Sequence, residues 1–294
     1  MNTQLSGTIA VFDALDVQGG AVIDSLLSRG ARVRGLVREL DSERAQSLAG
    51  RGVELVRVEI SDAASLLAAL QGVDAFFFMT TVEGGNHDVD GETRQGIALI
   101  DAAVAAAVPN VVFSSVGGAD RDSGVPLFES KRHLEERLQK SGLRSTLVRP
   151  VVYMDHLPSL GPTVEDGEFV LRMPLPDHIP LQLIAIRDIG QISASFLLGT
   201  TEAPGGTIEI AGDQRTGSQI AAAFGERAGL PARYEALPLH AFDDNPHLQA
   251  MFRWLQETPA FQADIEAVRV IEPTVWDLPA WIRSSGWTVP IPGQ

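Results

Sequence analysis

Short apolar runs alternate with segments of helical period through the first 150 residues, and this alternation constrains the fold more than any other feature. The apolar runs are bounded by turn residues and separated by stretches in which apolar side chains recur every three or four positions. Strand and helix alternating at this spacing predict βαβ units and a parallel sheet. Right-handed crossovers then predict a doubly wound α/β fold with helices on both faces. The expected strands are 8–12, 33–37, 53–58, 75–79, 110–114 and 145–149, and the expected helices are 17–28, 93–107, 127–141 and two that begin at 42 and 63.

The pattern loosens after Pro150, where prolines become frequent and the expected elements are short. We therefore predict a nucleotide-binding domain over residues 1–150 and a smaller α+β part over 151–294. In doubly wound sheets ligands bind in the crevice at the carboxyl ends of the strands. The second part is expected to supply the substrate pocket and its lid there.

Composition excludes several kinds of partner. The chain has no cysteine, which excludes disulfides, thiolate metal sites and thiol nucleophiles. A net charge of −15 argues against a nucleic-acid surface, which needs clustered Lys and Arg. The most apolar run, Ile97–Val108, is too short to span a bilayer and contains Asp101. Because Met1–Gly7 lacks the features of a secretory signal, we expect a cytoplasmic protein that binds a small molecule, with monomer and homodimer both left open.

The turn after the first expected strand departs from the glycine-rich pattern that cradles a dinucleotide in a Rossmann fold. On a GxxGxxG template the three positions are Asp13, Asp16 and Gly19, so only the glycine that packs helix on strand is present. Asp16 would place a carboxylate at the helix N-terminus, where a diphosphate is normally bound. We expect the two carboxylates to oppose NADP(H) binding. In the alternative interpretation Asp16 is an N-cap and the cofactor binds in a displaced pose.

Short motifs spread along the chain follow one another in an order typical of one known family. They are VQGG at 17–20, VFSSVGGAD at 112–120, SK at 130–131, RP at 149–150 and IAGD at 210–213. Over nearly its whole length the chain resembles the NmrA-like family of atypical short-chain dehydrogenase/reductases. The resemblance implies a Rossmann-type fold that binds NADP(H) or NAD(H). It also implies either reduction of quinones, dyes or other small molecules, or redox sensing without turnover.

The resemblance also assigns cofactor-binding positions, to which Gly19 and Gly20 belong. Arg38, at the end of the second expected strand, matches a basic residue that meets the 2′-phosphate of NADP, and a guanidinium suits that contact. In the alternative interpretation, which is given equal weight, Arg38 is a surface arginine. Asp62 matches a position that contacts adenine, and it could instead be the N-cap of the following helix. Lys131 matches a position that could bind a ribose or a substrate oxygen.

The usual catalytic pair of short-chain dehydrogenases, Tyr-x-x-x-Lys, is absent. Lys131 is preceded four residues earlier by Leu127, so no tyrosine shares its helix face. We keep Lys131 as a catalytic candidate, with a solvent-exposed lysine paired with Glu135 as the alternative. Ser114 and Ser115 end the fifth expected strand and should face the same crevice.

Two loops at the carboxyl edge of the expected sheet carry further candidates for acid–base chemistry. His87 lies in a glycine-rich loop, and His156 follows Tyr153 just after the sixth expected strand. A histidine can act as general acid or base near neutral pH. No HExxH or other compact ligand spacing is present, so we expect no metal site.

Three functions remain open at this point. The one placed first is non-redox chemistry on a small organic molecule, such as cyclisation, isomerisation or elimination, with impaired dinucleotide binding. The second is an NADPH-dependent reductase of quinone-like or other small molecules. The third is a non-catalytic sensor or regulator that binds a ligand.

Overall fold

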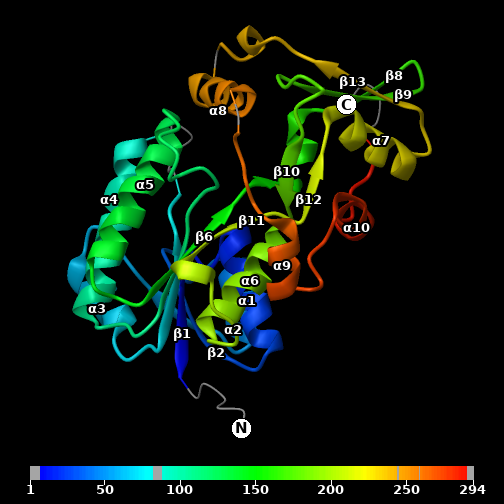
Figure 1. Cartoon of the computed structure of the whole chain (residues 1–294). Helices are drawn as coiled ribbons and strands as arrows, with labels where there is room; N and C mark the ends of the chain where they lie inside the picture. The colour runs from blue at the N-terminus through cyan, green and yellow to red at the C-terminus, as the bar shows by residue number, and fades with distance from the viewer. Residues whose placement is uncertain (1–6, 82–87, 244, 258, 290–294) are drawn as a thin grey trace.

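A twisted, fully parallel sheet forms the centre of the larger part of the molecule (Figure 1). In the part of the chain that the structure describes, its strand order is β11-β6-β5-β4-β1-β2-β3. The computed structural model describes residues 7–81, 88–243, 245–257 and 259–289. The strands of this sheet are β1 (Thr8–Phe12), β2 (Arg32–Val37), β3 (Glu54–Arg57), β4 (Ala75–Met79), β5 (Val111–Ser114), β6 (Ser145–Pro150) and β11 (Thr207–Ile210).

Helices cover both faces of the sheet, which confirms the predicted doubly wound fold. Figure 1 shows α3, α4 and α5 on one side and α1, α2 and α6 on the other. The faces alternate along each strand: Phe77 of β4 packs toward α1 and α6, whereas Phe76 and Phe78 pack toward α3 and α4. All five residues of β4 are buried, as expected for a central parallel strand. These helices are α1 (Val17–Ser28), α2 (Glu43–Gly50), α3 (Ala63–Leu70), α4 (Val89–Ala105), α5 (Pro126–Lys140) and α6 (Ile186–Leu197).

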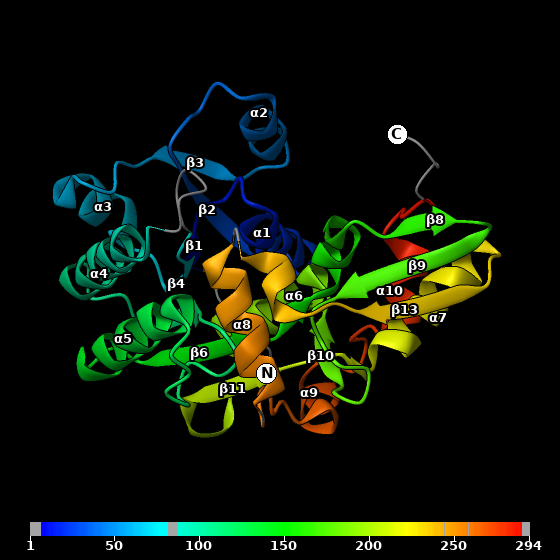
Figure 2. The same ribbon diagram turned by 90° about the horizontal axis from the view of Figure 1, so that it is seen from above.

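The rest of the chain forms a smaller α+β part beside the carboxyl edge of the sheet, seen from above in Figure 2. Within the described residues it holds two three-stranded sheets, of orders β12-β10-β7 and β13-β9-β8, around a separate apolar core. Its strands are β7 (Val152–Tyr153), β8 (Thr163–Glu165), β9 (Glu168–Met173), β10 (Leu181–Ile184), β12 (Asp213–Arg215) and β13 (Ala232–Ala236). Its helices are η2 (Met154–Leu160), α7 (Gly217–Ala228), η4 (Leu239–Phe242), α8 (Pro246–Gln256) and α10 (Leu278–Ser284).

Four elements among the described residues beyond 150 pack on the large sheet: α6, η3 (Pro204–Gly206), β11 and α9 (Ile265–Ile271), whose Val268 lies in its apolar core. β11 pairs in parallel with β6, and α6 packs along α1. The chain therefore leaves the large sheet after β6, builds β7 to β10, and comes back before it completes the smaller part. The expected division at residue 150 remains a prediction.

The strand order reverses between β1 and β4. On one side of β1 lie β2 and β3, and on its other side lie β4, β5 and β6. Chain crossovers leave in opposite directions at such a point, so a crevice opens at the carboxyl ends of the two strands. This reversal places the candidate site.

Candidate active site

A crevice with polar walls lies at the carboxyl ends of β1, β4 and β5. Its volume is about 340 Å³. The residues come from the turn before α1, from the strand ends, from α4 and α5, and from the segment that follows β6. They are Asp16, Val17, Gln18, Met79, Thr80, Glu92, Ser114, Ser115, Val116, Leu127, Phe128, Lys131, Tyr153 and His156.

The turn between β1 and α1 keeps the shape of a glycine turn although aspartates occupy it. Asp13 has a φ of +53°, in the left-handed region that favours glycine. A Cβ at Gly19 would lie 2.4 Å from the carbonyl oxygen of Asp13, so only glycine allows α1 to pack this closely on β1. At Gly20 the nearest atom to an added Cβ is 3.7 Å away, which leaves room for a side chain.

Asp16 is the N-cap of α1. Its Oδ1 accepts a hydrogen bond of 2.8 Å from the backbone N–H of Gln18, in agreement with the N-cap interpretation. One of the N–H groups that would otherwise be offered to an anion at the helix N-terminus is therefore already bonded to a carboxylate.

A buried ion pair forms the wall of the crevice between α4 and α5. The Lys131 ammonium bonds to the Glu92 carboxylate, to Thr80 Oγ1 at 2.6 Å and to the Thr80 carbonyl at 3.3 Å. Glu92 also accepts from Thr80 Oγ1 at 3.0 Å and from Ser130 Oγ at 2.6 Å, and only 2% of its side chain is exposed. Burial lowers the pKa of Lys131, and the Glu92 carboxylate partly opposes this.

The alternative prediction for Lys131, an exposed lysine paired with Glu135, is wrong. Glu135 is itself buried and accepts two hydrogen bonds from Arg149, at 2.9 and 2.6 Å. Such a bidentate pair takes both carboxylate oxygens, so Lys131 turns to the neighbouring helix and bonds to Glu92 instead.

Tyr153 enters the crevice from β7, opposite α1. Its hydroxyl oxygen accepts a hydrogen bond of 2.8 Å from Gln18 Nε2. Burial raises the pKa of Tyr153 to about 12, with smaller contributions from the carboxylates of Asp16 and Asp155, so the phenol is neutral at physiological pH. The ring of His156 lies 4.9 Å from that of Tyr153, and desolvation lowers the pKa of His156.

Three buried polar atoms of the crevice have no hydrogen-bond partner within the described structure. They are Gln18 Oε1, Ser114 Oγ and Ser115 Oγ, on side chains of residues that are 2%, 2% and 5% exposed. Buried polar groups in proteins are nearly always hydrogen-bonded, so three unpaired atoms in residues that line one crevice make it a candidate site for a polar ligand.

An apolar chamber adjoins the crevice. The two cavities share Val116, Phe128, Tyr153 and His156, and the chamber has a volume of about 500 Å³. Its remaining walls come from η2, β9, β10 and α8, which belong to the smaller part. They are Pro150, Val151, Val152, Leu157, Ser159, Leu160, Met173, Leu181, Leu248, Met251, Phe252, Leu255 and Phe261.

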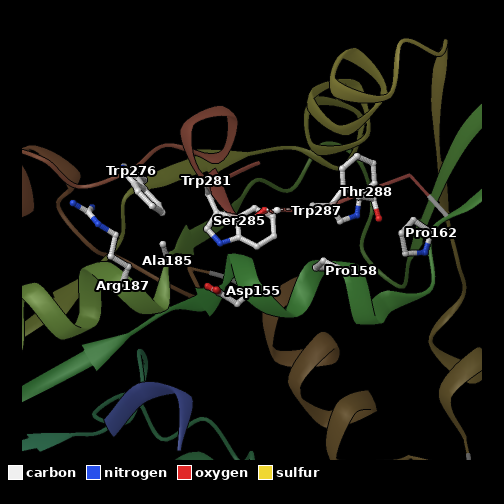
Figure 3. A pocket seen from close by; sticks show the side chains of 11 residues that line it. Asp155, Pro158, Pro162, Ala185, Arg187, Trp276, Trp281, Ser285, Trp287 and Thr288 are labelled. Atoms are coloured by element: carbon white, nitrogen blue, oxygen red, sulfur yellow. Dashed lines mark hydrogen bonds between the residues drawn. The ribbon is translucent and has the colours of Figure 1, made fainter. Parts of the chain in front are cut away.

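A third cleft lies on the other side of η2 and has a different character (Figure 3). Trp276, Trp281 and Trp287 line its volume of about 650 Å³, and the Arg187 guanidinium lies 4.3 Å from the ring centroid of Trp276. η2 contributes Asp155 to this cleft. The cleft shares no lining residue with the crevice or the chamber, so we treat it as separate from the site.

The other predicted site residues fall at different places. Arg38 is exposed directly after β2, where its contact with a 2′-phosphate stays a prediction. Asp62 is the N-cap of α3 and accepts from Ala64 N at 2.9 Å and Ser65 N at 3.2 Å. This is the structural one of its two predicted roles, and the adenine contact stays a prediction. His87 lies outside the described residues.

Metal-ligand clusters and membrane-spanning helices are both absent from the described ranges. No group of three or more His, Asp or Glu side chains in them is arranged to hold a metal ion. None of the helices described is both long and apolar enough to cross a bilayer.

Comparison with known proteins identifies the family. The sequence model of the NmrA-like family matches residues 6–278, which is most of the chain. The chain belongs to the NmrA-like family. Its sheet order and helix layers are those of the NAD(P)-binding oxidoreductase fold of this family, which confirms the resemblance drawn from the motifs.

Two curated relatives of this NmrA-like chain are reductases by name. It is 31% identical over 226 residues to an NAD(P)H azoreductase of Xenophilus azovorans, covering 75% of this chain and 74% of the relative. It is 28% identical over 235 residues to quinone oxidoreductase 2 of Escherichia coli, covering 78% and 77%.

Solved structures share the fold at lower sequence identity. One is an NADPH-dependent quinone oxidoreductase from Escherichia coli complexed with NADPH, with a TM-score of 0.79, 23% identity, and coverage of 94% of this chain and 99% of that one. Another is NmrA, a negative transcriptional regulator, in complex with NAD, with a TM-score of 0.79, 21% identity and 95% coverage of both chains.

Sequence reasoning did not single out Gln18, Glu92 or Thr80 as site residues. Thr80 directly follows β4, so its position at a carboxyl strand end was a usable signal. Gln18 belongs to the VQGG motif at 17–20, but the family resemblance assigned no separate role to this residue. Glu92 gave no signal, because its partner Lys131 is 39 residues away in the sequence.

Proposed function

We propose that this NmrA-like protein is an NAD(P)H-dependent reductase of small, largely apolar organic molecules. The observation that carries the proposal is the junction of the polar crevice with the apolar chamber at Tyr153 and His156. A polar cavity at the strand reversal suits a nicotinamide ring and its ribose. The adjoining apolar cavity suits an electron acceptor that must meet that ring away from water.

Observations at the crevice fit the cofactor. Asp13 has the left-handed backbone that favours glycine, and Gly19 packs closely on the Asp13 carbonyl, as expected of the first and third positions of a dinucleotide-binding turn. Gln18 Oε1, Ser114 Oγ and Ser115 Oγ are unpaired atoms that a carboxamide and ribose hydroxyls would satisfy. Asp16 departs from the pattern, because its carboxylate already bonds the N-terminus of α1. We therefore expect weak cofactor binding rather than none.

The bound cofactor would supply a hydride, and the chain's own residues supply the rest. The chamber walls exclude water from the acceptor, which prevents competing proton and electron leakage. Tyr153 holds a proton at its hydroxyl oxygen, since its pKa of about 12 keeps the phenol neutral. That proton lies at the boundary between crevice and chamber, where a reduced acceptor needs it.

The relatives favour the acceptor class. One is named an azoreductase and another a quinone oxidoreductase. Both kinds of acceptor are flat, unsaturated and mostly apolar, and each takes up a hydride and a proton. A chamber lined by Phe128, Phe252, Phe261 and several Leu and Met side chains suits such molecules.

The names of the relatives support this reductase, placed second from the sequence, over the non-redox function placed first. The non-redox function depends on the charge of Asp13 and Asp16, and we expect that charge to weaken dinucleotide binding rather than to prevent it. The sensor function shares the cofactor site with the reductase and differs from it only in turnover.

Calorimetric titration with NADPH and NADH tests the cofactor, and anaerobic oxidation of NADPH followed at 340 nm with quinones and azo dyes tests the reaction. We expect binding of one or both cofactors and acceptor-dependent oxidation. Absence of binding up to millimolar concentration would overturn the proposal and restore the non-redox function. Binding without turnover on any acceptor would favour the sensor.

A matched pair of variants tests the role of Tyr153, because the chain has only two tyrosines. Tyr153→Phe should lower turnover about 100-fold or more on acceptors that need a proton, with cofactor affinity unchanged. Tyr234→Phe is the control. Tyr234 donates its hydroxyl proton to the Leu175 carbonyl and lines neither cavity, so its loss should leave turnover unchanged.

A further inference from the structure

The hydrogen bond between Gln18 and Tyr153 has a direction that matters for proton transfer. Gln18 Nε2 donates and the Tyr153 hydroxyl oxygen accepts, at 2.8 Å. The tyrosine's own proton is therefore not used in this bond. Tyr234 is the opposite case, since its hydroxyl donates to the Leu175 carbonyl.

The Gln18 side chain is buried, and its backbone is fixed at the N-terminus of α1. Its residue is 2% exposed, and its backbone N–H bonds to the Asp16 carboxylate at the N-terminus of α1. Gly19, the next residue, packs directly on the Asp13 carbonyl, which fixes the first turn of the helix against β1. The amide of Gln18 thus reaches Tyr153 from a rigid element.

The charged and titratable groups around Tyr153 come from several elements. Asp16 precedes α1, while Asp155 and His156 belong to η2, and the carboxylates of Asp16 and Asp155 raise the pKa of the phenol. The Lys131–Glu92 pair of α5 and α4 lines the same crevice. Among the described contacts of the Tyr153 hydroxyl, the bond from Gln18 is the one that stabilises a phenolate.

We propose that Gln18 is a positioning residue that turns the Tyr153 proton toward the acceptor and stabilises the phenolate left behind. This rests on the proposed reductase function. The acceptor gains a hydride at one atom of its double bond, and the electron pair of that bond moves to the other atom. The O–H bond of Tyr153 breaks as its proton joins that atom, and the phenolate later regains a proton from water.

The energetic argument is that the hydrogen bond strengthens as charge develops on the tyrosine oxygen. A bond to a charged oxygen is about twice as strong as one to a neutral hydroxyl, so Gln18 stabilises the transition state more than the ground state. The second amide atom, Oε1, is buried without a hydrogen-bond partner among the described residues, so the Gln18 amide makes its described side-chain hydrogen bond through Nε2 to Tyr153.

Two substitutions separate these roles. Gln18→Leu removes the donor at similar volume and should lower kcat about tenfold or more, with the KM for NADPH changed much less. Gln18→Glu should lower kcat further, since its carboxylate would accept the Tyr153 proton and turn it away from the acceptor.

A double-mutant cycle provides the decisive kinetic control. In the Tyr153→Phe background, Gln18→Leu should cause no additional loss of kcat, because its partner is already gone. Equal losses in both backgrounds would overturn the proposal, since they would mean that Gln18 acts on the helix or the cofactor instead.

A measurement without turnover keeps this inference separate from the reductase proposal. In Tyr234→Phe protein labelled with [13Cζ]tyrosine, Tyr153 is the only labelled residue. Its resonance should move when Gln18→Leu removes the donated hydrogen bond. An unmoved resonance in an active reductase would refute the Gln18 role alone, whereas a moved resonance in a protein that oxidises no NADPH would refute only the reductase proposal.

Discussion

Glu92→Gln is the perturbation for which the structure gives the clearest magnitude. The Glu92 side chain is 2% exposed and that of Lys131 is 12% exposed, so this ion pair is largely out of water. Removing one partner of a buried pair leaves the other charge uncompensated and costs about 3–5 kcal/mol. Because the Lys131 ammonium keeps its bonds to Thr80, we expect the lower end, about 3 kcal/mol.

The loss should appear as a lower melting temperature and should depend on pH. The shift in melting temperature is the loss of free energy divided by the unfolding entropy, which is about 2 cal/mol/K per residue. For 294 residues a loss of about 3 kcal/mol lowers the melting temperature by roughly 5 °C. Without Glu92 the pKa of Lys131 falls further below its ordinary value. The folded state then binds fewer protons than the unfolded state between the two values, so stability rises with pH there and the deficit shrinks.

Urea unfolding followed by circular dichroism and by tryptophan fluorescence measures this at about pH 7 and pH 9.5. The double variant Glu92→Gln/Lys131→Met removes both charges and should be more stable than Glu92→Gln alone. Wild-type stability in Glu92→Gln, or a double variant no better than the single one, would refute the account of the pair as buried and mutually dependent.

Three further predictions address the turn and the core. Gly19→Ala should lower the free energy of unfolding by about 1–3 kcal/mol, because its Cβ would meet the Asp13 carbonyl oxygen. Gly20→Ala, where a Cβ has room, should leave it unchanged or raise it by up to about 1 kcal/mol. Equal effects of the two variants in urea unfolding would contradict this account. Asp16→Asn keeps the N-cap but removes the charge, so calorimetry should find NADPH bound about tenfold tighter, and unchanged affinity would mean that the diphosphate lies elsewhere. Burial in α6 raises the pKa of Asp188 to about 6, so the folded state binds more protons than the unfolded state between about pH 4 and 6. The free energy of unfolding should therefore fall as pH rises through that window. Asp188→Asn should abolish this fall, and a slope that persists in the variant would assign it to another group.

The fold could be predicted from the sequence because both of its periodicities are local. The apolar run Ala75–Met79 forms the fully buried β4, and the alternation of strands and helices is sufficient to predict a sheet with helices on both faces. What local patterns could not show is the return of the chain to the large sheet. β11 pairs with β6 across 56 intervening residues, from Val151 to Gly206, and this pairing leaves no trace in either segment alone.

The residues of the candidate site also fall into those that local sequence patterns could indicate and those that they could not. Ser115 and Tyr153 were identified because they lie at or just after strand ends, where a parallel sheet collects functional side chains. The partner of Lys131 was not, because Glu135 at i+4 is the neighbour that helix geometry offers. Arg149 takes that carboxylate by bidentate pairing, and α4 supplies Glu92 from across the helix interface.

The two aspartates place negative charge in the turn before α1, and the same turn is linked to Tyr153 across the crevice. Asp16 bonds the backbone N–H of Gln18, and the Gln18 side chain bonds the hydroxyl of Tyr153, so Gln18 connects the turn to the wall shared by the crevice and the chamber. A glycine at position 16 would remove the charge that opposes a diphosphate, but it would also remove the side-chain cap that holds Gln18. If the protein is a reductase as proposed, cofactor affinity and placement of the tyrosine proton both depend on Asp16. In this chain the cap is kept, so a cofactor bound as proposed would lie beside a carboxylate.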